Sequence, residues 1–322
     1  MKLAILDDYQ RVALQSADWK RLAVDVSVFE TAFSSEDDAA AKLQPFDIIC
    51  AMRERTAFPR SLIERLPNLK FVSLTGLRAV SMDSKFLGER GIPVSDTRTG
   101  NGTSSTAELT WGLIIVAARA MEQGMRNMRE GRWHGGLPAG IGLAGKRLGL
   151  LGLGKIGSAV GRVGKAFGMD VAAWSANLTP EKAAAEGARY LPKEELVATS
   201  DVVSIHLVLS ERTRGLVGAK ELAAMKPGAI LVNVSRGPIV DEKALIENLK
   251  SGRLHAALDV YDREPLPADH PLRRMENVTL APHLGYVNDE TYRIFHEDSV
   301  ENVQAWLAGK PIRVMNAEFL GK

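Results

Sequence analysis

The feature that most restricts the fold is a glycine-rich turn between two apolar segments. It lies in the stretch "KRLGLLGLGKIGSAVGRVG", which starts at Lys146. The pattern before the turn is that of a strand, the pattern after it is that of an amphipathic helix, and another strand begins near Asp170. A strand, a tight turn and a helix in this order are typical of a parallel sheet with crossover helices.

In this setting the spacing Gly-x-Gly-x-x-Gly predicts a dinucleotide-binding turn. Gly152 permits the tight turn, Gly154 lets a pyrophosphate approach the backbone, and Gly157 lets the helix pack on the strand. The following N–H groups, beginning at Lys155 and Ile156, would present the positive end of the helix to phosphates. The alternative is a glycine-rich turn with a structural role only.

The usual acidic partner of the cofactor ribose is missing. About twenty residues after the first glycine, where this acid is expected, the strand ends in Trp174 and Ser175. Asp170 lies at the wrong end of this strand to replace the acid. A neutral serine does not repel a 2′-phosphate, but the nearest cation, Lys182, belongs to the next predicted helix. We expect NAD or NADP as the cofactor, with weak discrimination and a slight preference for NADP.

Short apolar runs alternate with helical patterns along most of the chain. "KLAILD", "FDIICAM", "LKFVSLTG" and "IPVSDT" form one strand series, with "FPRSLIERLP" and "DSKFLGERG" as helices or turns between them. A second series comprises "KRLGLLG", "DVAAWS", "DVVSIHL", "AILVNVS", "HAALDV" and "VTLAP". We therefore predict an α/β fold of two parallel-sheet domains with a cleft between them, a common setting for a ligand site.

The segment between the two strand series predicts a hinge followed by a helix. "TRTGNGTSSTAE" is small and polar, and the residues from Glu108 to Arg132 have the pattern of one long helix. Ser105 followed by Glu108 fits a capping box at the start of this helix. The tail after Tyr286 is predicted to be helical and to end in a short extended piece.

Composition excludes several classes of function. The 322 residues include 41 Lys and Arg against 39 Asp and Glu, a formal net charge of +2, so neither nucleic acid nor an anionic membrane is an expected partner. The single cysteine, Cys50, rules out a disulfide framework or a cysteine zinc site within one chain, and no metal site is predicted. The longest apolar stretch meets Arg119 well short of a bilayer span. We expect a cytoplasmic protein.

Three charged residues follow predicted strands directly or closely: Arg236, Glu264 and His283. The carboxyl ends of parallel strands are where open α/β sheets bind ligands. An arginine there can pair with a substrate carboxylate, a histidine can donate a proton near neutral pH, and a glutamate can orient the histidine ring. Taken singly, each also fits a surface ion pair, a solvated loop carboxylate or a structural histidine.

Together with the glycine turn, these residues resemble the D-isomer-specific 2-hydroxyacid dehydrogenases. The matching pieces lie between about Asn101 and Tyr286 and read "GLLGLGKIG", "SDVVSIHLVLSERTRGLV", "MKPGAILVNVSRGPIVDEKAL", "ALDVYDREPLP" and "APHLGY". The resemblance implies that Arg236 holds the substrate carboxylate and carbonyl. His283 would donate a proton to the carbonyl oxygen, and Glu264 would sustain the imidazolium while the nicotinamide transfers hydride.

The resemblance also implies further cofactor contacts. Asp259 would meet the nicotinamide end, and the backbone around His206 and Val234 would line the adenosine and ribose portions. Thr106 would lie near the phosphates or the nicotinamide, or else only cap its helix. Gly285 belongs to the same implied set.

The family fold implies two Rossmann-like or flavodoxin-like domains. Residues 1–100 with 287–322 would form the substrate domain, and residues 101–286 the dinucleotide-binding domain. The family is usually dimeric through the cofactor domain, so we expect a homodimer with the long helix at its interface.

The loop after the third strand of the first series departs from the family pattern. Where the family has a glycine-rich loop that binds the substrate carboxylate, this chain has Gly76, Leu77 and Arg78. Arg78 would add a second positive contact to the substrate, or it is an exposed arginine at a strand end. The expected substrate is a small 2-oxoacid or 2-hydroxyacid, with glyoxylate or hydroxypyruvate favoured. The alternative function is a dinucleotide-sensing binding module of the co-repressor type, with little or no turnover.

Overall fold

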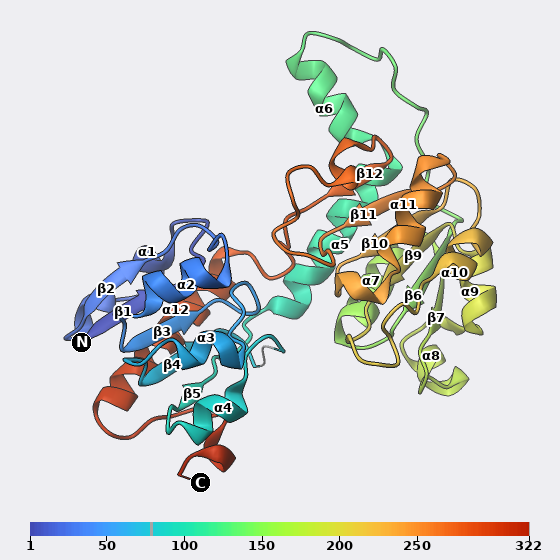
Figure 1. The fold of residues 1–322 in the computed structure, drawn as a ribbon. Coiled ribbons are helices and arrows are strands. Elements are labelled where there is room, and N and C mark those ends of the chain that lie inside the picture. Colours follow the sequence, from blue (N-terminus) through green and yellow to red (C-terminus); the bar gives the residue numbers. More distant parts are fainter. Residues whose placement is uncertain (78–79, 322) are drawn as a thin grey trace. The chain divides into compact units, whose positions relative to one another are not determined.

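The computed structural model describes residues 1–77 and 80–321, which form two compact units (Figure 1). Unit 1 comprises Met1–Asn101 and Asn288–Lys322, and unit 2 comprises Gly102–Val287. The chain therefore crosses from unit 1 to unit 2 and back. Each unit contains its own parallel sheet, as the alternation of apolar runs and helical patterns predicts.

The sheet of unit 1 has five parallel strands in the order β2-β1-β3-β4-β5. This is the flavodoxin-like order of a doubly wound sheet. The strands are β1 (Lys2–Ile5), β2 (Asp25–Val28), β3 (Ile48–Ala51), β4 (Phe71–Leu74) and β5 (Val94–Ser95). The sequence does not predict β2, because this edge strand begins with a charged residue and has no fully buried position. The central strands β3 and β4 are buried at every position, which explains their continuous apolar runs.

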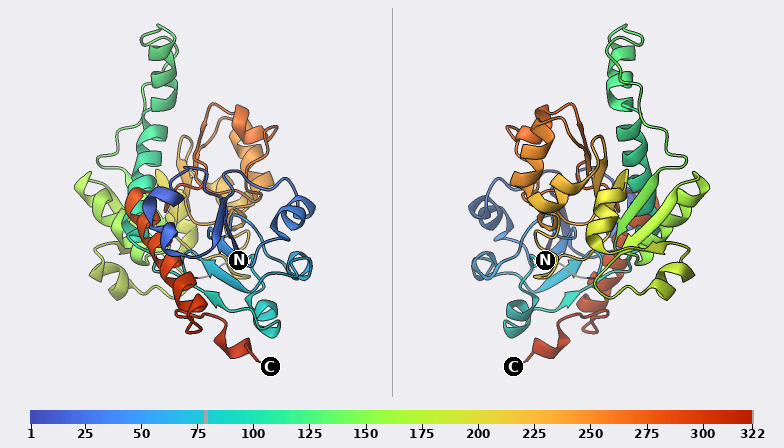
Figure 2. Two further views of the ribbon diagram at one scale, coloured as in Figure 1. Left: turned by 90° about the vertical axis from the view of Figure 1, so that its left-hand side faces the viewer. Right: turned by 90° about the vertical axis from the view of Figure 1, so that its right-hand side faces the viewer.

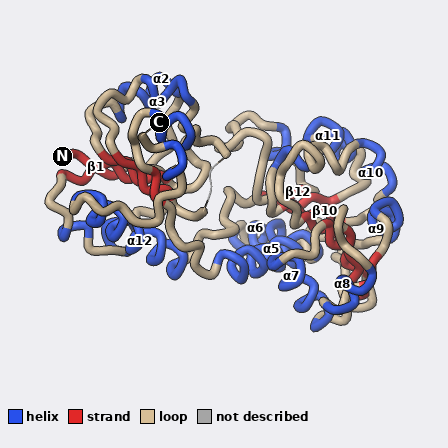
Figure 3. Tube along the Cα trace, turned by 90° about the horizontal axis from the view of Figure 1, so that it is seen from below, coloured by secondary structure: helices blue, strands red, loops and turns tan. Residues whose placement is uncertain are grey.

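Helices cover both faces of this sheet. They are α1 (Ala13–Ser16), α2 (Glu36–Leu43), α3 (Arg60–Glu64), α4 (Ser84–Glu89) and α12 (Asp289–Leu307), with short 3₁₀ turns η1 (Trp19–Arg21) and η4 (Ala317–Phe319). Figure 3 shows α2 and α3 on one face and α12 on the other. Beyond α12, Val314 pairs with Ser95 in an isolated antiparallel bridge, and the 3₁₀ turn η4 follows where the sequence predicts an extended piece.

The sheet of unit 2 has seven parallel strands in the order β12-β11-β10-β9-β6-β7-β8. This order places β6, β7 and β8 on one side of the switch point between β6 and β9, as in a Rossmann fold. The strands are β6 (Arg147–Leu151), β7 (Asp170–Trp174), β8 (Arg189–Tyr190), β9 (Val202–Ile205), β10 (Ile230–Asn233), β11 (His255–Leu258) and β12 (Val278–Leu280). The two-residue edge strand β8 is too short to leave a periodic signal in the sequence.

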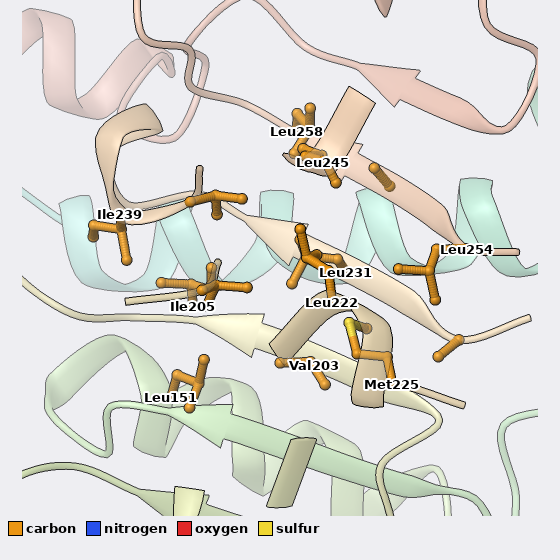
Figure 4. Close-up of a cluster of buried hydrophobic side chains, with 14 of the residues drawn as sticks. Leu151, Val203, Ile205, Leu222, Met225, Leu231, Ile239, Leu245, Leu254 and Leu258 are labelled. Atoms are coloured by element: carbon orange, nitrogen blue, oxygen red, sulfur yellow. The ribbon is translucent and has the colours of Figure 1, made fainter. Parts of the chain in front are cut away.

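Two apolar layers lie on the two faces of this sheet. The helices are α5 (Gly102–Ala118), α6 (Met121–Arg129), α7 (Lys155–Ala166), α8 (Pro180–Ala185), α9 (Lys193–Thr199), α10 (Ala219–Ala224) and α11 (Glu242–Lys250), with η2 (Gly237–Ile239) and η3 (Pro271–Arg274). Figure 4 shows the layer on one face, where Leu222 and Leu245 of α10 and α11 pack over strand residues such as Leu231. Helices α5 and α7 cover the opposite face.

The prediction of one long helix from Glu108 to Arg132 is wrong. Helix α5 ends at Ala118, Ala120 is left-handed with φ 46°, and α6 follows as a separate helix (Figure 2). The N–H of Ile141 donates to the carbonyl oxygen of Ala118 at 2.7 Å, and so occupies the acceptor that a continuing helix would use. The predicted capping box is also wrong, because α5 begins at Gly102 and Ser105 lies inside it.

None of the helices in the described part of the chain combines the length and the apolar character that a membrane crossing requires. Cys50 is buried within β3, where it packs as a small apolar group.

Candidate active site

The glycine turn follows β6 directly and requires glycine at two positions. Gly152 has φ 104°, and a Cβ there would lie 2.5 Å from the carbonyl oxygen of His206. A Cβ on Gly157 would overlap the carbonyl oxygen of Gly152. The turn and the start of α7 therefore pack more closely than any side chain would permit.

Gly154, by contrast, has an open face. It is the N-cap residue of α7, and none of the residues that the structure describes lies within 4 Å of the place where its Cβ would be. The first N–H groups of the helix, from Lys155 and Ile156 onward, have no acceptor within the helix itself. An open backbone surface at a helix amino end fits the pyrophosphate of a dinucleotide, so this turn is the candidate site for the phosphates of NAD(P).

The ribose end of this turn carries no carboxylate. Strand β7 ends at Trp174, and Ser175 follows it. Asp170 is the first residue of the strand and therefore lies at the opposite edge of the sheet. There its carboxylate forms an ion pair with Arg147 at 2.7 Å. Lys182 lies in α8, in the helix where the sequence predicts it.

Arg236 is presented by a tight turn after β10. The side chain of Asn233 donates to the carbonyl oxygen of Arg236 at 2.9 Å, and the hydroxyl of Ser235 donates to Ile205 at 2.8 Å. A Cβ on Gly237 would overlap the backbone of Tyr261. The Arg236 turn is thus packed against the segment that leads from β11 to Glu264.

Glu264 and His283 form a close pair. Nδ1 of His283 lies 2.5 Å from Oε2 of Glu264, and Oε1 of Glu264 accepts the N–H of Tyr261 at 2.9 Å. Both side chains of the pair are partly exposed. Within the described residues, no hydrogen bond is formed to the other ring nitrogen of His283, Nε2, so this atom can serve a substrate.

The charges around this pair favour an ionised carboxylate. Burial raises the pKa of Glu264, but the hydrogen bond and charge of His283, the N–H of Tyr261 and the charge of Arg236 outweigh it. The resulting pKa lies below the ordinary value of a glutamate. Both Arg236 and His283 are therefore close enough to Glu264 to affect its ionisation.

His283 has a strained backbone. Its φ of 55° lies in the left-handed region, which residues other than glycine adopt rarely. Such a conformation persists only where the surroundings hold it, and it is enriched at functional sites. The sequence contains no signal for this conformation, although it places His283 correctly after β12.

Asp259 and Thr106 contact the segment that follows His283. Oδ1 of Asp259 accepts the N–H of Leu284 at 2.6 Å, and Oδ2 accepts the N–H of Gly285 at 2.9 Å. The hydroxyl of Thr106 donates to the carbonyl oxygen of Gly285 at 2.9 Å. Burial raises the pKa of Asp259 to about 6, against the lowering effect of the Leu284 amide and of His283.

His206 and Val234 directly follow β9 and β10; β9 lies beside β6, and β10 lies beside β9. Their backbones therefore share the carboxyl edge of the sheet with the glycine turn. The Nδ1 atom of His206 is buried, and its Nε2 lies 2.9 Å from the hydroxyl of Ser204. Burial lowers the pKa of His206 to about 3, so the ring stays neutral near pH 7.

In unit 1, the residues after β4 form a second group of candidates. Gly76 has φ 79° and donates its N–H to the hydroxyl of Thr97 at 2.8 Å, and Leu77 is 55% exposed. Arg78 lies outside the described residues. Sequence analysis missed Arg53, which follows β3 and whose guanidinium occupies the space over Gly76. The sequence feature that indicated Arg236, a charged residue soon after a buried strand, is also present at Arg53.

Comparisons with known proteins agree with this arrangement. A family model described as "D-isomer specific 2-hydroxyacid dehydrogenase, NAD binding domain" matches residues 111–285. A glyoxylate reductase of Aeropyrum pernix is 40% identical over 268 residues, which cover 80% of this chain and 80% of that protein. A hydroxypyruvate reductase of Blautia hydrogenotrophica is 32% identical over 98% of this chain and 100% of its own length.

The solved structures lead to the same group of proteins. A phosphoglycerate oxidoreductase from Vibrio cholerae matches with a TM-score of 0.90 and 37% identity, covering 96% of this chain and 99% of its own. The names of these relatives favour an enzyme over a binding module. The chain belongs to the D-isomer specific 2-hydroxyacid dehydrogenases, NAD(P)-dependent oxidoreductases that interconvert a small 2-oxoacid and its D-2-hydroxyacid.

Proposed function

We propose that Arg236, Glu264 and His283 carry out this reaction, and that the substrate is glyoxylate or hydroxypyruvate. The observation that supports the roles most directly is the 2.5 Å pair of His283 and Glu264 within the electrostatic reach of Arg236. The substrate class is supported by the relatives, which are named glyoxylate reductase and hydroxypyruvate reductase.

In the reducing direction, His283 is the general acid. Its Nδ1–H donates to Glu264, which holds the ring in one orientation and favours the imidazolium. Nε2 then gives its proton to the carbonyl oxygen of the 2-oxoacid. The guanidinium of Arg236 binds the carboxylate through its planar fork and polarises the neighbouring carbonyl.

When bound, NADH or NADPH would supply the hydride for the carbonyl carbon. Gly152, Gly154, Lys155, Ile156 and Gly157 would hold its pyrophosphate. Ser175, His206 and Val234 would line its adenosine and ribose portions, and Asp259 and Gly285 its nicotinamide end. The preference for NADP is slight, because Ser175 removes the acid that would repel a 2′-phosphate while no adjacent arginine attracts one.

We further propose distinct roles for the two units. Unit 2 would bind the cofactor and unit 1 the substrate, with Arg53, Gly76 and Leu77 at the substrate-binding edge of unit 1. The enzyme would act in the cytoplasm as a homodimer. Exposed apolar side chains on α6 and the loop after it, Met125, Met128 and Trp133, support a contact with a second copy, because such side chains are enriched at interfaces.

The test is a panel of small 2-oxoacids, each measured with NADH and with NADPH, on the wild-type protein and on His283→Ala. Glyoxylate or hydroxypyruvate should give the highest kcat/KM. Loss of the general acid should lower kcat by about two to four orders of magnitude. Cofactor affinity, measured by nicotinamide fluorescence, should change little.

A matched control is available in the same unit. His270 pairs with Glu242 at 3.2 Å, so His270→Gln alters a similar histidine–glutamate pair that contains no candidate catalytic residue and should leave kcat unchanged. Unaltered turnover in His283→Ala would remove the assigned role of His283. Cofactor binding without turnover of any 2-oxoacid in the panel would favour the sensing module instead.

A further inference from the structure

Three hydrogen bonds converge on the two residues that follow His283. The carboxylate of Asp259 accepts the N–H groups of Leu284 and Gly285, and the hydroxyl of Thr106 donates to the carbonyl oxygen of Gly285. Among the described residues, Thr106 is the only donor to this carbonyl. Asp259 is fully buried and Thr106 is 9% exposed, so these bonds are shielded from water.

The segment they hold lacks regular structure. Residues 283–285 lie between β12 and α12 and belong to no helix or strand, so no ladder of backbone hydrogen bonds fixes them. His283 is left-handed, a conformation that the surroundings must maintain. A shift of Gly285 would be transmitted through Leu284 to the ring that contacts Glu264.

The hydrogen bonding of Thr106 argues against a direct contact to the cofactor phosphates. A threonine hydroxyl has one proton. In Thr106 this proton is shared between the carbonyl oxygens of Gly102, at 2.7 Å, and of Gly285, at 2.9 Å. A phosphate oxygen accepts hydrogen bonds and so needs a donor, which the Thr106 hydroxyl cannot provide while it keeps both carbonyls.

We infer that Thr106 is a positioning residue for His283, and that it acts through the carbonyl group of Gly285. The inference rests on the proposed role of His283 as general acid. Asp259 holds the N–H side of the same turn and Thr106 holds its carbonyl side. Together they keep the imidazole at the distance and angle that proton transfer requires.

Thr110 provides a matched control on the same helix. Thr110 is fully buried, and within the described part of the chain its hydroxyl donates only to the carbonyl oxygen of Thr106, one turn earlier in α5. Thr106→Val and Thr110→Val therefore both remove a buried hydroxyl from one helix. Only the first removes a bond to the segment after His283. Thr106→Ser keeps the hydroxyl and serves as the rescue variant.

The experiment measures kcat, KM, the pH–rate profile for reduction and the Kd of the reduced cofactor for these variants. In Thr106→Val we expect kcat to fall about three- to tenfold, the effect of one lost buried hydrogen bond. The alkaline limb of the profile should move to lower pH, because a displaced imidazolium is stabilised less by Glu264. The Kd of the cofactor should stay within about twofold. Thr106→Ser and Thr110→Val should resemble the wild type.

Several outcomes would overturn the inference. One is an unchanged kcat and pH profile in Thr106→Val; another is a weakened cofactor Kd with unchanged kcat at saturation, which would make Thr106 a cofactor contact. If Thr106→Val does not fold, Thr106→Ala is measured in its place. His283→Ala is included in the series, so that failure of the general-acid role, seen as retained turnover, is distinguished from failure of the role of Thr106.

Discussion

At the scale of single residues, the chemistry depends on how burial and charge act on a few ionisable groups. Glu264 keeps its charge because His283 and Arg236 outweigh the effect of burial, whereas burial dominates at Asp259 and raises its pKa to about 6. Two neighbouring carboxyl groups thus differ in their readiness to ionise. Of the two, only Glu264 forms a hydrogen bond to the ring of His283, so Glu264 is the carboxylate placed to support an imidazolium.

This difference predicts the effect of Glu264→Gln. Glutamine keeps an acceptor for Nδ1–H of His283 but removes the negative charge, so the imidazolium loses electrostatic support. We expect kcat for reduction to fall about ten- to a hundredfold, and the alkaline limb of the pH–rate profile to move to lower pH. Steady-state kinetics between pH 5 and pH 9 would measure both. A profile that keeps its wild-type shape would contradict the role of Glu264.

At the scale of elements, function depends on what stands at the carboxyl ends of neighbouring strands. Strands β6, β9, β10 and β11 lie side by side in unit 2, and the residues that follow them include most of the candidate cofactor and catalytic groups. Strand β7 is next to β6 and ends in Trp174, with Ser175 after it. Cofactor selection is therefore expected to depend on this one strand end.

We predict that Ser175→Asp changes the cofactor preference toward NAD. A carboxylate at the end of β7 can accept hydrogen bonds from the ribose hydroxyls and repels a 2′-phosphate. The ratio of kcat/KM with NADH to kcat/KM with NADPH should rise about tenfold or more, as one charge-assisted interaction implies. Asn177→Asp adds the same charge to the exposed loop two residues later and should leave the ratio unchanged. An unaltered ratio in Ser175→Asp would show that the ribose lies elsewhere.

At the scale of the whole molecule, each unit contains a buried neutral histidine. Burial lowers the pKa of His296 in unit 1 to about 4 and that of His206 in unit 2 to about 3. In the unfolded chain both histidines should have a pKa of about 6.5. Below this pH the unfolded state binds more protons than the native state, so the free energy of unfolding falls by about 1.4 kcal/mol per pH unit for each histidine.

In unit 2, Asp259 has the opposite effect on the pH dependence of the free energy of unfolding. Its native pKa of about 6 lies above the ordinary value of 3.8, so its contribution favours the native state below that ordinary value and is lost as the pH rises through about 6. In unit 1, we expect His296 to lower the free energy of unfolding as the pH falls below about 6.5.

His296→Phe tests this prediction. His296 is 2% exposed, packs against the rings of Trp19 and Tyr292, and has no hydrogen-bond partner for Nε2 among the described residues. Phenylalanine keeps the ring contacts and removes the titrating group. Between pH 7 and pH 5, the melting temperature of the variant, followed by circular dichroism, should fall less than that of the wild type. An equal fall in both proteins would show that His296 does not limit stability in acid.

The sequence by itself determined the parallel-sheet architecture and the edge of the sheet at which the candidate residues lie. Apolar runs, helical periodicity and the glycine turn are local properties, and parallel strands all end on the same edge, so the places of Arg236 and His283 followed without coordinates. Only the tertiary structure decided that α5 stops at Ala118 and that His283 is left-handed. It also decided that Thr106 bonds to Gly285, 179 positions away. These features depend on hydrogen bonds between distant segments, which packing brings together and which local propensity does not encode.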